Sequence, residues 1–338
     1  MIIGIIGCGG IAHAHVLAIS QIKQIKGLAF YDINRNNMLN LKKIATLPVT
    51  LCENIEQLAK ASNAFVICTP NNLHFSLAKE VLHYNRIPLL CEKPLSTNFE
   101  LASKLVEISP PKSIVSFNYR YNRIVKKILF LKDSKKLGKL VFFSADFNKN
   151  SALTRNYLTW RDSEQQNKSS GALGDLSCHL IDLFHIFSES KTDINQLKVV
   201  KGTRVKTKEG GYVEVDDNGY IFGSSVNNAF FRLHASKSET VDSLGLHLNL
   251  IFEKGEIRYS TRNINTIYLF KFDKKEVVEI LLSEKRIISD PPKELPFWAD
   301  SFIYLYRDWC QLLKNSECSK LVPKITEGLY IQKIIEEF

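Results

Sequence analysis

The segment GALGDLSCHLIDLF, residues 171–184, carries side chains that could move a proton. Asp175, His179 and Asp182 follow one another at intervals of four and three residues, so on an α-helix all three lie along one face. Histidine titrates near neutral pH and suits general acid or base chemistry, and a nearby carboxylate can orient the imidazole or a substrate hydroxyl. A satisfied histidine on a half-buried helix would leave the same pattern, so this segment alone leaves both readings open.

A second chemically useful residue, Lys93, follows an apolar run in the segment LLCEKPLST. Pro94 disfavours the helical conformation for Lys93 and favours an extended one, which fixes the direction of the lysine side chain. An ammonium at that place could polarise a carbonyl or stabilise an alkoxide. The alternative is a surface lysine that pairs with Glu92.

The first residues, MIIGIIGCGGIA, contain a dinucleotide-binding pattern directly after an apolar strand and at the start of a helix. Gly7 permits a tight turn, Gly9 lets a pyrophosphate approach the backbone, and Ala12 allows close helix packing. Asp32 closes the second apolar run, where a carboxylate would bind the ribose hydroxyls. We therefore predict NAD as the cofactor, with NADP left open because Arg35 could accept a 2′-phosphate.

Further cofactor contacts are expected where later strands end. Pro70 stops the fourth apolar run, and Asn71 or Asn72 can cap the next helix, although a simple strand-to-helix turn would look the same. His74 is expected to be structural or to touch the cofactor. The predicted cofactor set is Gly7, Gly9, Gly10, Ile11, Ala12, Asp32, Arg35, Thr69, Pro70, Asn71, His74, Glu92 and Lys93, and no metal site is expected.

These residues need a scaffold that brings the ends of several strands together. The first 120 residues alternate short apolar runs with amphipathic stretches, which predicts an α/β fold with a doubly wound parallel sheet of the Rossmann type. Strands are expected at 2–7, 28–32, 49–52, 64–69, 87–92 and 113–118, and helices at 11–24, 35–46, 54–61, 73–85 and 97–108.

The pattern changes after residue 120. Short β-rich runs separated by turn residues over 196–282 are typical of an antiparallel sheet, and helices are expected at 297–315 and 326–337. We predict two domains. A dinucleotide-binding domain spans 1–120, and an α+β substrate-binding and dimerisation domain with a large, mostly antiparallel, open-faced sheet spans 121–338. The closing helices could pack back on the first domain.

Composition narrows the classes of partner. The net charge of +10 is spread along the chain without interleaved aromatic residues, so we predict an anionic small molecule rather than nucleic acid. Seven scattered cysteines, with no CxxC pair, indicate a reducing compartment, and we expect a cytoplasmic protein without disulfides. No apolar run approaches the ~18 residues of a membrane span, and the N-terminus looks like a strand rather than a signal peptide.

Together the motifs resemble the glucose–fructose oxidoreductase / inositol dehydrogenase / MocA (Gfo/Idh/MocA) oxidoreductases. The resemblance covers residues 2–183 and is carried by GIIGCGGIAHAH, YDINR, VICTPNNLH, LLCEKPLS, SFNYR and GALGDLSCHLIDL. It implies an NAD(P)-dependent enzyme acting on a secondary alcohol or ketone of a sugar, cyclitol or nucleotide sugar. It also implies that Lys93 is the electrostatic stabiliser, His179 the acid and base, and Asp175 the orienting residue. Ser177 departs from the family, because many members have glycine there.

The same resemblance places Arg120, Trp160 and Arg161 in segments that line the active site, so they join Lys93, Asp175 and His179 as predicted substrate contacts. Each of the first three could equally be a packing aromatic or a surface cation, and Asp182 is expected to be structural. The predicted substrate is carbohydrate-like, and the basic charge favours an anionic or nucleotide-linked sugar.

An uncovered sheet face would seek a partner, so we expect a homodimer or a tetramer built through the C-terminal sheet. Two other functions stay open at this point. One is a non-catalytic dinucleotide-binding sensor or assembly protein, and the other is a reductase of a non-sugar substrate.

Overall fold

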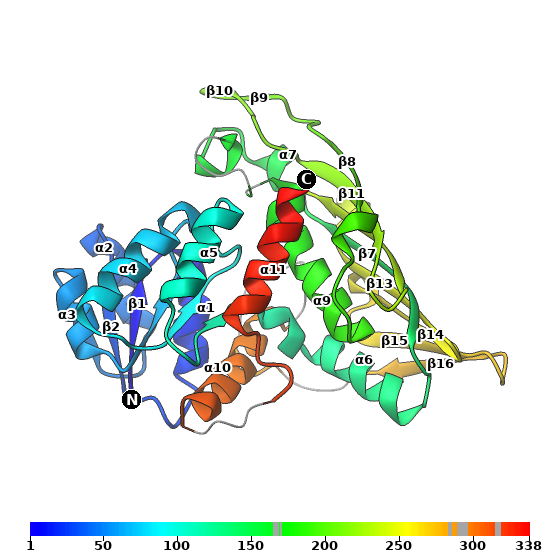
Figure 1. Cartoon of the computed structure of the whole chain (residues 1–338), viewed down its shortest axis with the longest axis horizontal. Helices are drawn as coiled ribbons and strands as arrows, with labels where there is room; N and C mark the ends of the chain where they lie inside the picture. Colours follow the sequence, from blue (N-terminus) through cyan, green and yellow to red (C-terminus); the bar gives the residue numbers. More distant parts are fainter. Residues whose placement is uncertain (165–168, 170, 283–285, 289–296, 315–318) are drawn as a thin grey trace. The chain divides into compact units, whose positions relative to one another are not determined.

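The structure is a computed structural model that describes residues 1–164, 169, 171–282, 286–288, 297–314 and 319–338. The chain divides into two compact units, each built around its own sheet (Figure 1). The first unit comprises Met1–Tyr121 and Trp298–Lys333, and the second comprises Asn122–Phe297 and Ile334–Phe338.

The first unit contains a six-stranded sheet in the order β3-β2-β1-β4-β5-β6, with every neighbouring pair parallel. The predicted doubly wound fold is thereby confirmed. The strand order reverses between β1 and β4, and ligands of such folds bind beyond the carboxyl ends of the strands at this point. The strands are β1 (Ile2–Ile6), β2 (Gly27–Tyr31), β3 (Val49–Leu51), β4 (Ala64–Ile67), β5 (Leu89–Cys91) and β6 (Ile114–Val115).

The helices of this unit begin where the sequence supplies caps. Asn34, Asn54 and Asn98 each accept a backbone hydrogen bond at the start of the following helix. The helices are α1 (Gly10–Ile19), α2 (Arg35–Ile44), α3 (Ile55–Ala61), α4 (His74–Tyr84), α5 (Phe99–Ile108) and α10 (Trp298–Lys314), and α11 (Ile325–Glu336) belongs here up to residue 333. The predicted helices near the end of the chain are therefore present, and α10 packs on α1.

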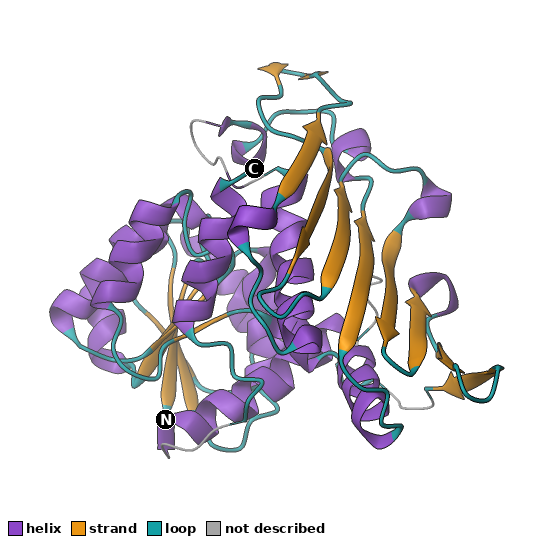
Figure 2. Cartoon of the chain, turned by 45° about the vertical axis from the view of Figure 1, so that its right-hand side comes forward, coloured by secondary structure: helices purple, strands orange, loops and turns teal. Residues whose placement is uncertain are grey.

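The second unit contains an eight-stranded sheet in the order β16-β15-β14-β13-β7-β12-β11-β8. Figure 2 shows the strands in orange. The neighbouring strands of this sheet are antiparallel except β7 and β12, so the predicted mostly antiparallel sheet is also confirmed. The strands are β7 (Leu140–Asn148), β8 (Lys198–Gly202), β11 (Asn218–Ser224), β12 (Phe230–Ser236), β13 (Gly245–Phe252), β14 (Gly255–Ser260), β15 (Thr266–Lys271) and β16 (Glu276–Leu281). A separate pair is β9 (Thr207–Lys208) and β10 (Gly211–Tyr212).

The two faces of the larger sheet differ, because alternate residues of each strand point to opposite sides. On one face, Phe143 and Phe231 pack against Phe184 of α9 (Cys178–Ser188). On the other face, Phe222 and Phe230 are 42% and 58% exposed. The helices α6 (Arg123–Ser134) and α7 (Ser151–Thr154) complete the unit.

In the ranges described above, no helix is both long and apolar enough to cross a membrane. The cysteines in those ranges, Cys8, Cys52, Cys68, Cys91, Cys178 and Cys310, are all buried and free. Cys318 lies outside them.

Candidate active site

The glycine turn after β1 leaves room for a phosphate. Gly7 has a φ of +85°, and a Cβ atom there would lie 2.7 Å from the Thr69 side chain, so this position requires glycine. A Cβ atom on Gly9 or Gly10 would meet nothing within 4 Å, and both residues are exposed. Since Gly9 offers no side-chain cap to α1, the first amides of that helix can bind a pyrophosphate.

Asp32 is fixed at the end of β2 beside this turn. One carboxylate oxygen accepts from the Cys8 amide at 2.7 Å, and the other accepts from the Asn34 amide at 2.8 Å and the Asn37 side chain at 3.2 Å. The carboxylate is half-exposed and keeps acceptor capacity for a ribose hydroxyl. Arg35 is exposed at the first position of α2. The residues present therefore fit NAD.

The loop after β4 is tied to the loop after β5. The His74 ring is buried between two backbone carbonyls, with Nε2 3.0 Å from Thr69 O and Nδ1 3.1 Å from Leu95 O. Burial lowers the pKa of His74. Asn71 donates its side-chain amide to the Ser96 carbonyl at 3.1 Å. Through these contacts His74 and Asn71 hold the two loops together at the carboxyl edge of the sheet. Pro70 and Ile11 belong to the same edge, because each comes shortly after a strand of the sheet.

Lys93 is half-buried in a bend directly after β5. Its neighbour Glu92 is only 6% exposed, and the Glu92 carboxylate lies 2.8 Å from Nε2 of His15. His15 is not among the residues predicted from the sequence, because its only local signal is a histidine on an apolar helix. Glu92 thus bonds to the protein itself, while the Lys93 side chain is the more accessible of the two.

Asp175 does not lie in an α-helix as the spacing suggested. It belongs to a π-helical turn, Leu173–Ser177, that runs into α9, and His179 is the second residue of α9. A Cβ atom on Gly174 would lie 2.3 Å from the Ser169 carbonyl oxygen, so glycine is required for this close approach. Ser177, fully buried, donates its hydroxyl to the Leu173 carbonyl within the turn. Such π-helical turns occur frequently at functional sites.

Two residues that the sequence analysis missed hold this turn. Asp216 accepts from the Leu173 amide at 2.8 Å, and Lys237, directly after β12, lies with Nζ 2.9 Å from the Asp175 carboxylate. The Lys237 side chain is 12% exposed and that of Asp175 is 29% exposed. Burial raises the pKa of Asp216, and Lys237 opposes that rise. No local pattern marks a lysine so distant in sequence as a partner of Asp175.

The remaining predicted residues have varied surroundings. Arg120 is 1% exposed and pairs with Glu327 at 3.2 Å, so a substrate contact would require this pair to open. Trp160 and Arg161 lie in a short 3₁₀ turn, with the Arg161 guanidinium 4.1 Å from the Trp160 ring centre. Asp182 is buried in α9, close to the middle of the helix.

The structure thus groups the predicted site in two sets. The glycine turn, Asp32 and Lys93 belong to the first unit, while Asp175 and His179 belong to the second. That Lys93 and His179 converge on one substrate stays a prediction.

Comparison with known proteins gives a consistent result over the whole chain. Residues 1–119 match an oxidoreductase family described by its NAD-binding Rossmann fold, and residues 133–338 match the C-terminal alpha/beta domain of the same family. A glucose-6-phosphate 3-dehydrogenase of Bacillus subtilis is 34% identical over 99% of this chain and 95% of its own length. A levoglucosan dehydrogenase of Pseudarthrobacter phenanthrenivorans is 31% identical over 35% of this chain and 30% of its own length.

Solved structures share the fold at lower identity. An oxidoreductase domain protein from Kribbella flavida superposes with a TM-score of 0.83 at 20% identity, covering 99% of this chain and 94% of that one. A levoglucosan dehydrogenase in complex with NADH and levoglucosan gives a TM-score of 0.83 at 18% identity, covering 99% of this chain and 95% of that one. With both family domains present, the chain belongs to the Gfo/Idh/MocA family of NAD(P)-dependent oxidoreductases.

Proposed function

We propose that this protein is an NAD-dependent dehydrogenase that oxidises a secondary hydroxyl of a phosphorylated hexose. The observation that carries the proposal is the 34% identity, over almost the full length of both chains, to a glucose-6-phosphate 3-dehydrogenase. The net charge of +10 suits an anionic substrate.

The proposed roles follow from the chemistry of alcohol oxidation. Bound NAD⁺ would take the hydride from the carbinol carbon. His179 would accept the hydroxyl proton, and the Lys93 ammonium would stabilise the developing alkoxide. Asp175, held by Lys237, would orient the substrate hydroxyl or the imidazole. In the direction of reduction the same groups would return the proton.

The direct test is NADH formation by the purified protein. NAD⁺ or NADP⁺ is mixed with glucose 6-phosphate, glucose, levoglucosan, a nucleotide sugar or myo-inositol, and absorbance of the reduced cofactor is followed. We expect the highest kcat/KM with NAD⁺ and glucose 6-phosphate. Turnover of free sugars in preference to the phosphate would overturn the substrate class. Failure to bind NADH or NADPH in a fluorescence titration would overturn the cofactor assignment.

The catalytic assignment has a matched control on the same helix. We expect His179→Gln to lower kcat by about 10²–10⁴-fold with little change in the Kd for NADH. His185 is also on α9, where Nε2 lies 2.9 Å from the Thr192 hydroxyl, and His185→Gln should change kcat less than threefold. Equal activities of the two variants would remove His179 from the mechanism.

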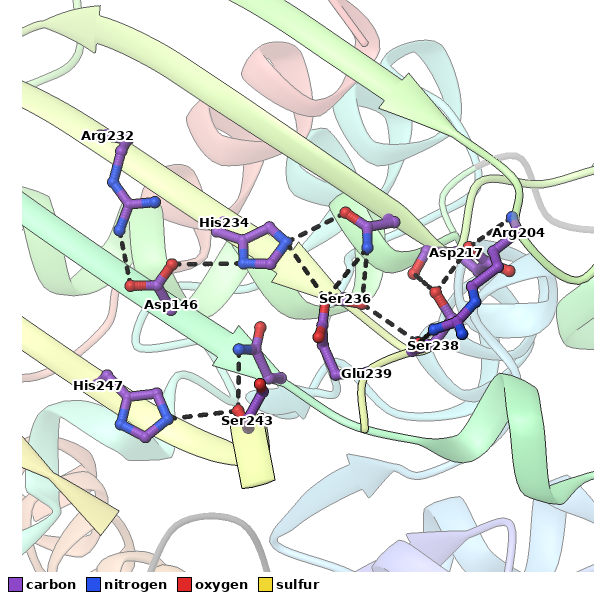
Figure 3. A network of polar contacts seen from close by, with 12 residues as sticks. Asp146, Arg204, Asp217, Arg232, His234, Ser236, Ser238, Glu239, Ser243 and His247 are labelled. Carbon is purple, nitrogen blue, oxygen red and sulfur yellow. Dashed lines mark hydrogen bonds and ion pairs between the residues drawn. The ribbon is translucent and has the colours of Figure 1, made fainter. Parts of the chain in front are cut away.

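We also propose that a second copy of this chain covers the open face of the larger sheet. The exposed residues Phe222 and Phe230 share this face with charges of both signs. Among these charges, Asp146 of β7 lies between Arg232 and His234 of β12 (Figure 3). A face with both charges can complement itself across a two-fold axis. We expect sedimentation to report a dimer or tetramer, and Phe230→Lys to shift it to monomer. A monomeric wild type would contradict this proposal.

The free buried cysteines suit a reducing compartment, so we place the protein in the cytoplasm.

A further inference from the structure

Buried polar side chains next to the Lys93 bend form a hydrogen-bonded series. His15 of α1 is fully buried, and its Nε2 lies 2.8 Å from Oε1 of Glu92. On the other side of the ring, Nδ1 lies 2.6 Å from the hydroxyl of Tyr306 on α10. Phe302 of the same helix packs on the ring at 4.6 Å. These hydrogen bonds therefore connect α1, the end of β5 and α10.

In the series Glu92–His15–Tyr306, the two outer residues determine which atoms carry the hydrogens. A carboxylate only accepts, so Nε2 of His15 carries a hydrogen toward Glu92. Burial raises the pKa of Tyr306 well above 10, so the phenol keeps its proton. Both ring nitrogens of His15 thus have a partner, and the imidazole cannot turn without breaking two hydrogen bonds.

The Glu92 carboxylate, at one end of this hydrogen-bonded series, is an anion. Burial of Glu92 opposes its ionisation, but the hydrogen bond from His15, with smaller contributions from Ser116 and Lys93, holds the pKa of Glu92 below 4.5. Two thiols and one imidazole near it are kept uncharged, because burial raises the pKa of the Cys68 and Cys91 thiols and lowers that of His74. Glu92 therefore supplies the negative charge of this cluster.

A buried anion is costly, because burial removes the water that would otherwise solvate its charge. The position of this one gives it a use: it directly precedes Lys93, and the Lys93 amide donates to Oε2 of Glu92 at 3.3 Å. The attraction between two charges is mutual, so the charge of Glu92 acts on Lys93 as much as Lys93 acts on Glu92. We propose that Glu92, clamped by His15 and Tyr306, is a positioning residue that keeps the Lys93 side chain in its ammonium form. The catalytic use of that ammonium rests on the proposed function.

The charge of Lys93 can be measured without substrate. Lysines of the whole protein are reductively ¹³C-methylated, and the Lys93 signal is assigned by its absence in Lys93→Arg and followed by NMR during a pH titration. We expect Glu92→Gln to move the midpoint of Lys93 to lower pH by about one unit, because the neighbouring anion is gone. The control Glu100→Gln breaks an exposed pair with Lys104 and should leave the Lys93 midpoint unchanged. An unchanged midpoint in Glu92→Gln would overturn the inference.

A second variant keeps the test decisive if Glu92→Gln does not fold. Tyr306→Phe removes only the hydroxyl at the far end of the series, and we expect a smaller shift in the same direction. Its control is Tyr259→Phe, because the Tyr259 hydroxyl is buried without a hydrogen-bond partner among the described residues. If Tyr306→Phe shifts Lys93 no more than Tyr259→Phe does, the clamp has no such role.

Activity separates this inference from the proposed function. In an active wild type, Glu92→Gln should move the alkaline limb of the kcat/KM profile to lower pH by about one unit, with the Kd for NADH within about threefold. A purely structural clamp would change the melting temperature alone and leave that limb in place. If the NMR shift is found but no sugar is oxidised, the proposed function fails and the charge assignment stands.

Discussion

The close approach between Gly174 and Ser169 makes the π-helical turn testable by one methyl group. In Gly174→Ala the new Cβ atom would lie 2.3 Å from the Ser169 carbonyl oxygen and 2.7 Å from its carbonyl carbon, against 3.4 Å for ordinary contact. Both neighbours are backbone atoms, so one segment must move by about 1 Å. Overpacking of this kind costs about 2 kcal/mol, which lowers the melting temperature of a unit this size by about 4–8 °C.

The same displacement should reach the chemistry, because Asp175 follows Gly174 directly and His179 begins the next turn. A misplacement of about 1 Å can cost up to about 100-fold in kcat. The assays are thermal unfolding by circular dichroism and steady-state kinetics, with the Kd for NADH expected to be unchanged. The control is Gly202→Ala, where an exposed glycine of β8 has nothing within 4 Å of the added atom. Equal melting temperatures and equal kcat values for the two variants would refute the close approach.

Two further substitutions test separate parts of the site, and a third tests the turn that contains Trp160 and Arg161. Lys237→Met should lower kcat about tenfold without weakening NADH binding, since Asp175 loses its 2.9 Å partner. Asp32→Ala should raise the Kd for NADH at least about tenfold, by fluorescence titration, because charged hydrogen bonds are worth about 1.5–3 kcal/mol. Asp162→Asn should lower the free energy of unfolding by about 1–3 kcal/mol at neutral pH. Although burial opposes ionisation, Lys208 at 2.8 Å helps to lower the pKa of Asp162 from 3.8. The stabilisation is therefore present above 3.8 and is lost as the pH falls through the lower folded pKa, so the two urea-unfolding curves should converge there.

The predicted site residues of the first unit whose place in the fold could be read from the sequence are those that follow strand ends. Gly7, Asp32 and Lys93 each come directly after a buried apolar run, and parallel strands end at the same edge of a sheet. A local signal therefore carried spatial information. The alternation of short strands and amphipathic helices was enough to predict the sheet itself.

The surroundings of Asp175 were beyond the sequence because they depend on distant segments. Residues four apart in the sequence give the same pattern whether the turn is α-helical or π-helical. The π-helical turn found here packs against the Ser169 backbone, and Asp216 accepts a hydrogen bond from its first amide. Lys237 likewise reaches Asp175 from the end of β12. The hydrogen bond between His15 and Tyr306 joins residues 291 positions apart. No periodicity encodes such pairs.

In each of the two candidate catalytic segments, a carboxylate pairs with a residue that is distant in sequence. The two pairs, Asp175–Lys237 and Glu92–His15, differ in their exposure to solvent. The Asp175–Lys237 pair is partly exposed, so water screens it and its net contribution to stability is small. The Glu92–His15 pair is buried, so loss of either partner leaves an uncompensated polar group in the interior. Lys237→Met should thus reduce kcat while the melting temperature hardly changes, whereas Glu92→Gln should lower the melting temperature. If Lys237→Met lowered stability as much as Glu92→Gln, the Asp175–Lys237 pair would be stabilising the fold rather than orienting Asp175.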